Sequence, residues 1–362
     1  MRRKLVAACF ALVLALTVIV CSPVSAKETV WKMTSTWPSG ITLIDSHKMF
    51  VDLVNGMCKG KLRIEFFPGG TLMSAFEVFD ATRNNTVQAA GDWCGYWAGK
   101  DIVFSLLGAC PMGLTQWDQL IWLKYFGGEE LFNEAFGKFG MVYLVNVISP
   151  AESGLRSNKP IKSLDDMKGK KIRMSGKSQG YVLKELGCSQ VILAGSEVYQ
   201  ALQKGTIDAA EFSGPFIDLN MGLAEVTKYW LSPGWHQPGS NGGIMINKQA
   251  WDALDADTQK MLKAAADVCC LNSSAQMCYE DIKGTAGFLE KGVEVYNLSD
   301  EELAKIERIS NRYMEQIAKE DSLSKKVIQS WIDYRKTYAP VRSSKAPFGF
   351  GFNPKDYPNL DE

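Results

Sequence analysis

The sequence predicts an α/β protein made of two lobes. Segments with strand and helix patterns alternate from residue 29 to residue 93, and a second alternating series starts near residue 154. The 362-residue chain keeps 336 residues (362 minus 26) after removal of a predicted leader, which exceeds the size at which one hydrophobic core usually keeps growing. A cleft between the two lobes is therefore expected.

Residues 1–26 are predicted to be a secretory signal peptide. Three basic residues at positions 2–4 precede an apolar run over 5–20, and small residues at 24–26 supply a cleavage site. The apolar run is short for a bilayer span, and no later segment is apolar enough to be one. Cys21 invites a lipid anchor, but no small residue precedes it. The sequence thus predicts an exported mature chain that begins at Lys27 and is not inserted in a membrane.

The charge and the cysteine pattern exclude several classes of protein. Removal of the leader takes away three of 40 basic residues and none of 40 acidic ones, which leaves 37 against 40 and a formal charge near −3. No nucleic-acid partner is expected from such a balance. Seven of nine cysteines follow the leader, without zinc-site spacing, and the chain has two histidines, so a zinc enzyme is not expected. A disulfide between Cys270 and Cys278 stays open.

The first alternating series predicts a lobe with a mostly parallel sheet. Strands are expected over 29–37, 61–67 and 87–93, and the helices between them over 44–57 and 77–84. A βαβαβ order favours parallel strands joined by helical crossovers.

The second series repeats this organisation. Strands are expected at 154–157, at 171–174, near Val191 and at 207–212, and helices at 180–186 and 197–204. Ser196 is a favourable N-cap for the second helix, and Gly205 a favourable residue just after its end.

The last third of the chain is predicted to be mostly helical. Apolar residues recur at helical spacing over 248–289, and a further helical region runs from Asp300 to Tyr338 with a break near Asp321. Residues 343–362 are rich in glycine and proline and read as an extended tail.

Several ordered motifs resemble those of the solute receptors of TRAP (tripartite ATP-independent periplasmic) transporters, in the branch that binds 2-oxo acids and related monocarboxylates. They span most of the mature chain and are, in order, 67–72 (FPGGTL), 77–81 (EVFDA), 96–101 (YWAGKD), 111–113 (PMG), 170–173 (KKIR), 197–205 (EVYQALQKG), 208–211 (DAAE) and 233–239 (PGWHQPG).

The resemblance implies a class II periplasmic-binding-protein fold, in which two α/β lobes are joined by hinge strands and a long helix. It places lobe I at 27–150 plus about 238–280, lobe II at 151–237 plus about 281–340, and a C-terminal tail at 341–362. It implies a periplasmic receptor and not an enzyme, which delivers a small organic carboxylate to the permease subunits of an ion-driven transporter.

Arg173 is the first candidate for the ligand site. It lies in a strand where Ile172 and Met174 face one way and Arg173 the other. Without the resemblance, such an arginine is more often a solvated edge residue. Members of the resembled family place an arginine here on the ligand carboxylate, and a guanidinium fork suits a carboxylate better than the single charge of lysine.

Glu211, Phe212 and Glu152 are the next candidates. In the resembled branch, a glutamate at the position of Glu211 and the following aromatic residue help to hold a cation that bridges to the ligand. Here Phe212 stands where that branch prefers tryptophan, and Glu152 where it has glutamine. Two negative charges near the ligand favour either a hard sodium or calcium ion bound by oxygen atoms or the ammonium group of an α-amino acid. No organic cofactor is expected.

Aromatic and amide side chains complete the predicted site. Tyr96 and Trp97 match the aromatic pair of the family, and Trp37 and Trp93 follow or end predicted strands, although Trp93 is as readily a core residue. Gln237 offers both a donor and an acceptor. The smaller Phe212 suggests room for a larger, aromatic ligand side chain. His236, beside Gln237, is expected to belong to a hinge or to the cleft.

Other functions are not supported by motifs. Residues 175–178 (SGKS) resemble the end of a phosphate-binding loop, but the required earlier glycine falls on Lys171. A receptor of the same fold for an ABC transporter or a sensor, and an exported enzyme, are the alternatives in descending order. The solute itself, the presence of a metal and the oligomeric state are not determined by the sequence.

Overall fold

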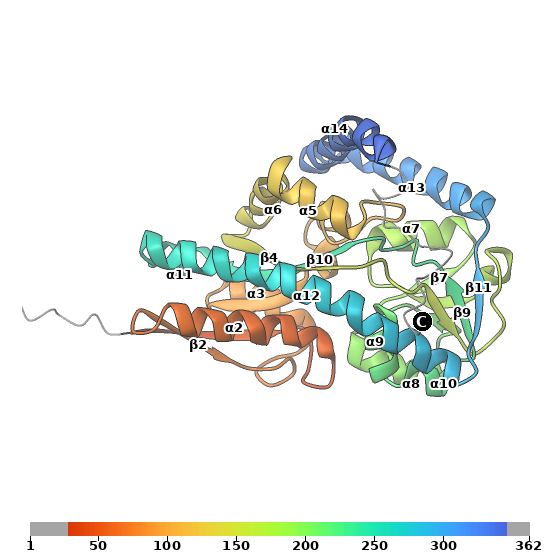
Figure 1. Ribbon diagram of the computed structural model, residues 1–362, viewed down its shortest axis with the longest axis horizontal. Helices are drawn as coiled ribbons and strands as arrows, with labels where there is room; N and C mark the ends of the chain where they lie inside the picture. The colour runs from red at the N-terminus through yellow and green to blue at the C-terminus, as the bar shows by residue number, and fades with distance from the viewer. Residues whose placement is uncertain (1–27, 346–362) are drawn as a thin grey trace, which may run out of the picture.

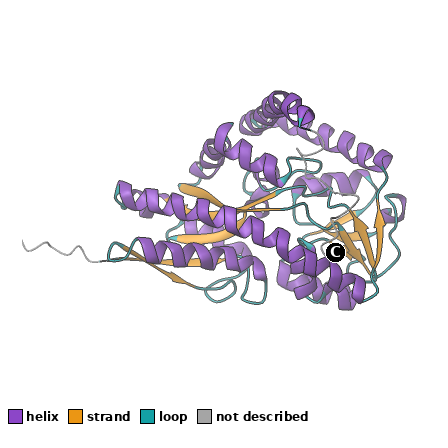
Figure 2. Cartoon of the chain, viewed as in Figure 1, coloured by secondary structure: helices purple, strands orange, loops and turns teal. Residues whose placement is uncertain are grey.

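Two sheets, each covered by helices, lie side by side in the computed structural model, which describes residues 28–345 (Figure 1, Figure 2). The predicted signal peptide, residues 1–26, lies outside the described residues. Residues 346–362 of the predicted tail lie outside them as well. Within residues 28–345, no helix combines the length and the apolar character that crossing a membrane requires.

The first sheet has the strand order β2-β1-β3-β10-β4. Its strands are β1 (Thr29–Ser35), β2 (Leu62–Phe66), β3 (Ala89–Trp93), β4 (Met141–Ser149) and β10 (Ser240–Asn247). β1 runs parallel to β2 and β3, whereas β10 runs antiparallel to β3 and β4. The sheet is thus mixed, and the expected mostly parallel sheet is correct only for its first three strands, because β10 returns from the second lobe.

Helices cover both faces of this sheet. α2 (Asp45–Met57) packs on one face, where Phe50 lies in the same buried apolar cluster as Met33 of β1. The opposite face carries α3 (Val78–Arg83) and the α5–α6 pair. Helices α5 (Gln116–Tyr125) and α6 (Gly128–Gly137) were not predicted from the sequence.

The second sheet has the strand order β11-β9-β5-β8-β6-β7. Its strands are β5 (Leu155–Ser157), β6 (Lys171–Arg173), β7 (Ser189–Val191), β8 (Ala209–Ala210), β9 (Tyr229–Ser232) and β11 (Glu294–Asn297). β6 is flanked by β7 and β8, both parallel to it. β8 is shorter than the predicted 207–212, so Glu211 follows the strand and does not lie in it.

The helices of the second lobe begin slightly earlier than predicted. α7 (Lys177–Glu185) follows β6, and α8 (Gly195–Gln203) follows β7. The N-cap of α8 is Ala194 and not Ser196, because the Glu197 carboxylate accepts a hydrogen bond from the Ala194 backbone N–H at 3.0 Å. Ser196 therefore lies inside the first turn.

The connections between the lobes include the segment between β4 and β5, the segment between β9 and β10, and the long helix α12 (Ala256–Glu290) (Figure 1). α12 packs on α2 and β4 in the first lobe and on α9 (Pro215–Asn220) in the second. Gly284 permits this last contact, because a Cβ there would lie 2.1 Å from Phe216 N. The short α11 (Lys248–Asp252) precedes α12, so the predicted helical region 248–289 is two helices.

The last helix packs on the first lobe, whereas the helix before it also packs on α7 of the second lobe. α13 (Asp300–Glu320) and α14 (Ser322–Ser344) are separated at Asp321, which confirms the predicted break. Trp331 of α14 packs on Trp122 of α5, with ring centroids 5.8 Å apart. The interpretation that 281–340 belongs with lobe II is therefore wrong for α14, and residues 341–344 of the predicted tail are helical.

The cysteines of the described residues are all free. Cys270 is buried and Cys278 is exposed, and both lie on α12. Eight residues of an α-helix span about 12 Å, beyond the separation of about 7 Å that a disulfide can bridge. A Cys270–Cys278 disulfide is therefore excluded in this fold.

Candidate functional site: a closed cavity between the lobes

A cavity lies between the lobes, beyond the carboxyl ends of β1, β3, β6 and β8. This is the edge at which α/β sheets usually bind ligands. Fourteen residues line the cavity: Trp37, Leu43, Trp93, Tyr96, Val147, Ser149, Glu152, Ser175, Phe212, Ser213, Gln237, Ser240, Gly242 and Met277. Six predicted site residues are thus brought together at the cavity surface: Trp37, Trp93, Tyr96, Glu152, Phe212 and Gln237.

Arg173 and Glu211 form an ion pair beside this cavity. The parallel register of β6 and β8 sets Arg173 opposite Ala210, so Glu211 comes next to the guanidinium. Nη1 donates to the Glu211 carbonyl oxygen at 2.6 Å and to Oε1 at 2.9 Å. Both side chains are only 1% exposed, which indicates a closed cleft.

Most donors of Arg173 are already used by the protein. Nε and Nη2 donate to the Leu193 carbonyl oxygen at 3.3 and 3.1 Å, and Nη1 makes the two bonds to Glu211. A guanidinium has five N–H groups. One N–H on Nη2 thus remains without an acceptor among the described residues, and a two-bond grip on a ligand would require Glu211 to release a bond.

Glu211 is held on one side only. Its Oε1 accepts hydrogen bonds from Arg173 and from the backbone N–H of Ser175 at 3.0 Å. Its Oε2 is buried and accepts no hydrogen bond from the described residues. A buried acceptor without a partner is unfavourable and indicates a missing donor, ion or ligand group.

Glu152 and His236 make a second pair, on the two strand connections between the lobes. Glu152 Oε2 lies 2.9 Å from His236 Nε2. Burial lowers the pKa of His236 to about 4. Burial, followed by the negative charge of Glu211, raises the pKa of Glu152 well above its usual range. Burial thus disfavours a charge on either group in this form.

The two connections are fixed to each other by backbone contacts. The Glu152 N–H donates to the Gln237 carbonyl oxygen at 3.0 Å. Gly234 is required for this approach, because a Cβ there would lie 1.9 Å from the Glu152 carbonyl oxygen. Gln237 Oε1 is buried without a donor among the described residues.

A buried aspartate of α9 ties together the loops that carry both glutamates. Asp218 Oδ1 accepts a hydrogen bond from the Ser213 N–H at 3.1 Å, and Oδ2 accepts one from Ser153 Oγ at 3.0 Å. Ser153 follows Glu152 directly, and Ser213 comes two residues after Glu211. Asp218 therefore fixes the relative position of the two carboxylates.

Arg156 forms a buried ion pair with Asp218. Its Nε donates to Asp218 Oδ2 at 3.1 Å, and both side chains are fully buried. The guanidinium carbon lies 3.7 Å from the Trp230 ring centroid and 3.9 Å from that of Phe288. Burial lowers the pKa of Arg156 to about 10 and raises that of Asp218 to about 6, which shows that the environment penalises both charges.

The first lobe contributes aromatic rings to the cavity. The Trp37 indole stacks on His47 with centroids 4.8 Å apart, and His47 Nδ1 is 3.0 Å from Ser35 Oγ. Trp93 and Tyr96 meet edge to face at 5.1 Å. The Trp93 Nε1–H is buried without an acceptor among the described residues, so it is available to a ligand.

Of the two aromatic residues Trp97 and Phe212, only Phe212 reaches the cavity. Trp97 lies in the core of the first lobe, where it packs on Phe79 with centroids 5.1 Å apart and donates from Nε1 to Asp92, so the structure does not bring it to the cavity. Phe212 does line the cavity, and its ring centroid lies 5.2 Å from the Arg173 guanidinium carbon. It thus covers the arginine.

Several residues of the site were not predicted. Ser175 belongs to the SGKS segment, which was considered only as a phosphate loop, although its position after a strand was a usable signal. Asp218 and Ser149 carry no sequence signal, because their roles depend on which loops meet in space.

Glu152, Glu211 and His236 are close enough to hold a metal ion. Each offers one ligand atom, and these atoms lie within 4.8 Å of one another. Together with the unpartnered Gln237 Oε1, the donor set is mainly oxygen, which suits a hard cation such as sodium or calcium. The residues therefore fit the predicted ion.

The profile of the bacterial extracellular solute-binding proteins, family 7, matches residues 33–321. The chain belongs to this family. The monocarboxylate 2-oxoacid-binding periplasmic protein of Nostoc sp. is 30% identical over 311 residues, which are 84% of this chain and 84% of that relative.

Solved structures of other members resemble the whole molecule. A TRAP periplasmic solute-binding protein from Pseudoalteromonas atlantica, with bound sodium and pyruvate, superposes with a TM-score of 0.83 at 27% identity, over 88% of this chain and 97% of that one. A TRAP solute-binding protein from Bordetella bronchiseptica, with calcium and picolinate, gives a TM-score of 0.84 at 26% identity, over 88% and 95%.

Membership in family 7 confirms the two-lobed periplasmic-binding-protein fold predicted from the sequence. It also confirms the resemblance to TRAP solute receptors that the sequence motifs indicated. Family 7 consists of solute-binding transport receptors and not of enzymes.

Proposed function

We propose that this family 7 protein captures a small 2-oxo or 2-hydroxy monocarboxylate for a TRAP transporter, with a calcium ion between Glu152 and Glu211. The observation that carries the proposal is a set of buried polar atoms without partners around one cavity. Glu211 Oε2 and Gln237 Oε1 are acceptors, and Trp93 Nε1 is a donor. Buried polar groups are rarely left unpaired in a functional state, so an occupant is expected.

The division of these atoms matches the two parts of such an occupant. The unpartnered acceptors suit a cation, whereas the Trp93 N–H and the remaining Arg173 N–H suit ligand oxygen atoms. A bound cation would neutralise the two carboxylates and bind the oxo or hydroxyl oxygen and one carboxylate oxygen of the ligand. The relatives with sodium and pyruvate or calcium and picolinate support this class of ligand.

The charge balance favours calcium over sodium. Glu152 and Glu211, both ionised beside a cation, and the ligand carboxylate contribute three negative charges, and Arg173 contributes one positive charge. The sum of −2 is neutralised by one divalent ion. With glutamine at position 152 the sum becomes −1, which one sodium ion neutralises.

Calorimetric titration tests this proposal. We expect pyruvate and lactate to bind to the native protein in calcium, and to bind much more weakly after chelation in a sodium buffer. Glu152→Gln is expected to bind them in sodium alone. Absence of binding of every 2-oxo and 2-hydroxy acid in calcium would refute the proposal.

An α-amino acid is the second candidate, because an ammonium group can replace the cation between the two glutamates. In that case, amino acids bind after chelation and calcium does not strengthen their binding. The aromatic walls also accommodate an aryl ligand, and a thermal-shift screen in which pyruvate exceeds every aryl analogue would exclude a preference for such ligands.

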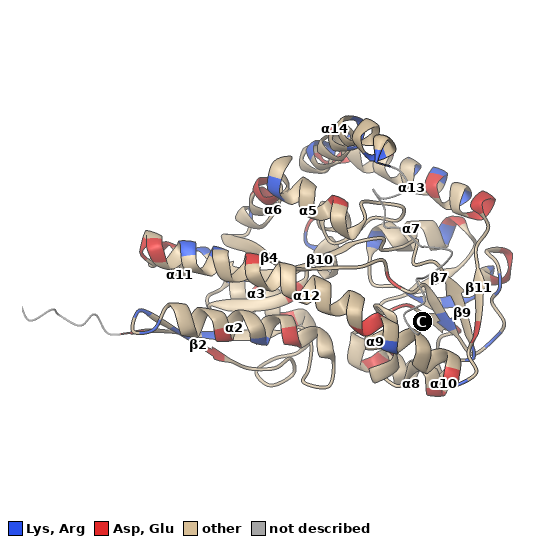
Figure 3. Cartoon of the chain, in the orientation of Figure 1, with Lys and Arg blue, Asp and Glu red and all other residues tan. Residues whose placement is uncertain are grey.

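The proposed cellular setting follows from family membership. The receptor would act in the periplasm and deliver its ligand to the membrane permease subunits of the transporter. Acidic and basic residues are interspersed along the helices and strands drawn in Figure 3.

A further inference from the structure

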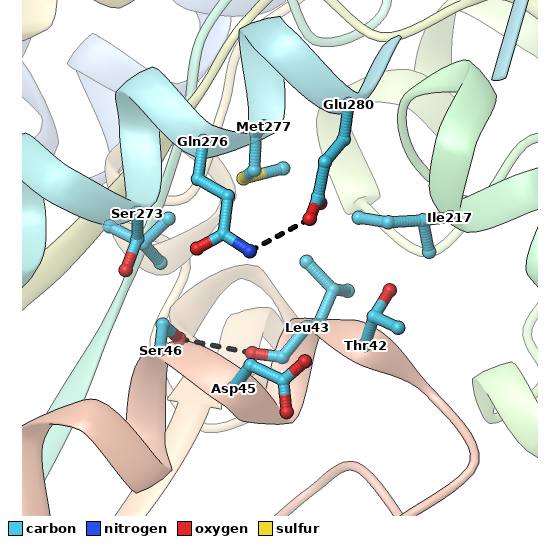
Figure 4. A pocket seen from close by; sticks show the side chains of 10 residues that line it. Thr42, Leu43, Asp45, Ser46, Ile217, Ser273, Gln276, Met277 and Glu280 are labelled. Carbon is cyan, nitrogen blue, oxygen red and sulfur yellow. Dashed lines mark hydrogen bonds between the residues drawn. The ribbon is translucent and has the colours of Figure 1, made fainter. Parts of the chain in front are cut away.

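A second cavity, whose lining side chains are drawn in Figure 4, shares part of its wall with the first. It lies between the start of α2, the middle of α12 and α9. It shares Leu43, Val147 and Met277 with the ligand cavity. The two cavities are therefore separated by the thickness of these three apolar side chains.

We call this second cavity the side chamber. Its other lining residues are more polar than the three residues that it shares with the ligand cavity. They are Thr42, Asp45, Ser46, Ile217, Ser273, Gln276 and Glu280. Asp45 is paired with Lys48 at 2.9 Å, so its charge is partly balanced. Glu280 Oε1 accepts a hydrogen bond from Gln276 Nε2 at 2.7 Å, and no cationic side chain is paired with it among the described residues.

Two hydroxyl groups of the side chamber have no partner. Ser273 is 6% exposed, and its Oγ makes no hydrogen bond with the described residues. Thr42 Oγ1 is likewise buried and unpartnered. These atoms are independent of the acidic groups, and they indicate that the chamber receives a polar occupant.

We propose that the side chamber binds the distal end of a longer ligand, whose carboxylate group occupies the main cavity and whose far end carries an ammonium group. The inference rests on the proposed function. The methylene chain would pass Leu43 and Met277, and the flexible Met277 side chain can adapt to it. The ammonium group would pair with Glu280 and donate to Ser273 Oγ.

Three ligands of one series test the inference by calorimetry in calcium: lactate, 2-hydroxyheptanoate and 6-amino-2-hydroxyhexanoate. The last two have the same length and differ in the terminal methyl or ammonium group. We expect the amino compound to bind about tenfold more tightly than its methyl counterpart, as for one partly solvated hydrogen bond to a charged group. Glu280→Gln is expected to abolish this ratio.

Glu290→Gln is the matched control, because Glu290 is an exposed glutamate near the end of the same helix and outside the chamber. It should keep the tenfold ratio. If lactate binds but the ratio is one in the native protein, or persists in Glu280→Gln, the side chamber is not a ligand subsite. If neither lactate nor pyruvate binds, the proposed function itself fails.

Discussion

The two walls of the ligand cavity differ in chemistry. The wall from the second lobe holds Arg173 and Glu211 in a network of charged hydrogen bonds. The wall from the first lobe is built from aromatic rings, including Trp37 and Trp93, and no charged side chain from that lobe lines the cavity. We therefore expect the charge of a ligand to be recognised by the second lobe and its shape by the first.

This difference has a consequence for the order of binding. Charged groups give orientation and selectivity in a mostly apolar site, whereas rings contribute when water is excluded. We therefore expect a carboxylate to bind first to the second lobe and the connections, and the first lobe to close over it. Four predictions test this division, in order of decreasing effect.

Asp218→Ala should have the largest effect of the four changes, a loss of stability in the second lobe. The change leaves Arg156 buried without its carboxylate, which should lower the free energy of unfolding by about 3–5 kcal/mol. Urea denaturation measures this loss. The exposed pair of Asp257 and Lys260, 3.7 Å apart, supplies a control: Asp257→Ala should leave the free energy of unfolding almost unchanged. Equal losses in both variants would contradict the role of the buried pair.

If Asp218→Ala does not fold, Asp218→Asn retains an acceptor for Ser213. It should fold and still weaken ligand binding, because the loops of Glu152 and Glu211 lose one of their shared bonds. Native affinity in this variant would show that the loops are fixed by other contacts.

Arg173→Lys should reduce ligand affinity by about 10- to 100-fold, as for the loss of one charge-assisted hydrogen bond to the ligand. One ammonium group cannot bond Leu193, both Glu211 acceptors and a ligand at once. Calorimetry compares it with Lys171→Arg, a change at the exposed first residue of the same strand. Unchanged affinity in Arg173→Lys would remove Arg173 from the site.

A substitution of His47, which stacks on Trp37, tests whether the stability of the aromatic wall requires a neutral imidazole ring. Burial lowers its pKa to about 3, so between pH 6.5 and 3 the unfolded chain binds a proton that the folded protein does not. Its contribution to stability should fall as the pH decreases, by about 1.4 kcal/mol per pH unit. The difference in the free energy of unfolding between wild type and His47→Gln should therefore decrease with acidification.

The control for this pH dependence is Lys59→Gln, an exposed change just after the same helix. Its difference from wild type should stay constant from pH 6.5 to 4. A constant difference in His47→Gln as well would show that His47 is protonated in the folded protein.

Trp93→Phe should have the smallest effect, a loss of affinity of about fivefold, because it removes one neutral donor from the ligand cavity. Trp122→Phe removes an indole N–H that donates to Ser330 Oγ at 2.9 Å, far from the ligand. The latter should lower stability without changing ligand affinity. Equal affinities in wild type and Trp93→Phe would make Trp93 a purely structural residue.

Site residues that lie in or near the ends of strands could be predicted from the sequence. Strand patterns placed Arg173 within a strand at 171–174 and Glu211 near the end of a strand at 207–212, and the resemblance to TRAP receptors indicated which polar residues to select. The prediction for Trp97 was less successful, because its neighbour Tyr96 lines the cavity while Trp97 turns into the core. A short 3-10 helix at this point decides the direction of each ring, and sequence spacing does not show it.

The sequence by itself determined the two-lobed α/β fold and the family, because apolar periodicity and ordered motifs are local and survive in one chain. Only the tertiary structure decided that α14 packs on the first lobe. It also decided that Asp218 links the loops of Glu152 and Glu211. These facts depend on contacts between residues distant in the chain, which burial and geometry fix and local pattern does not.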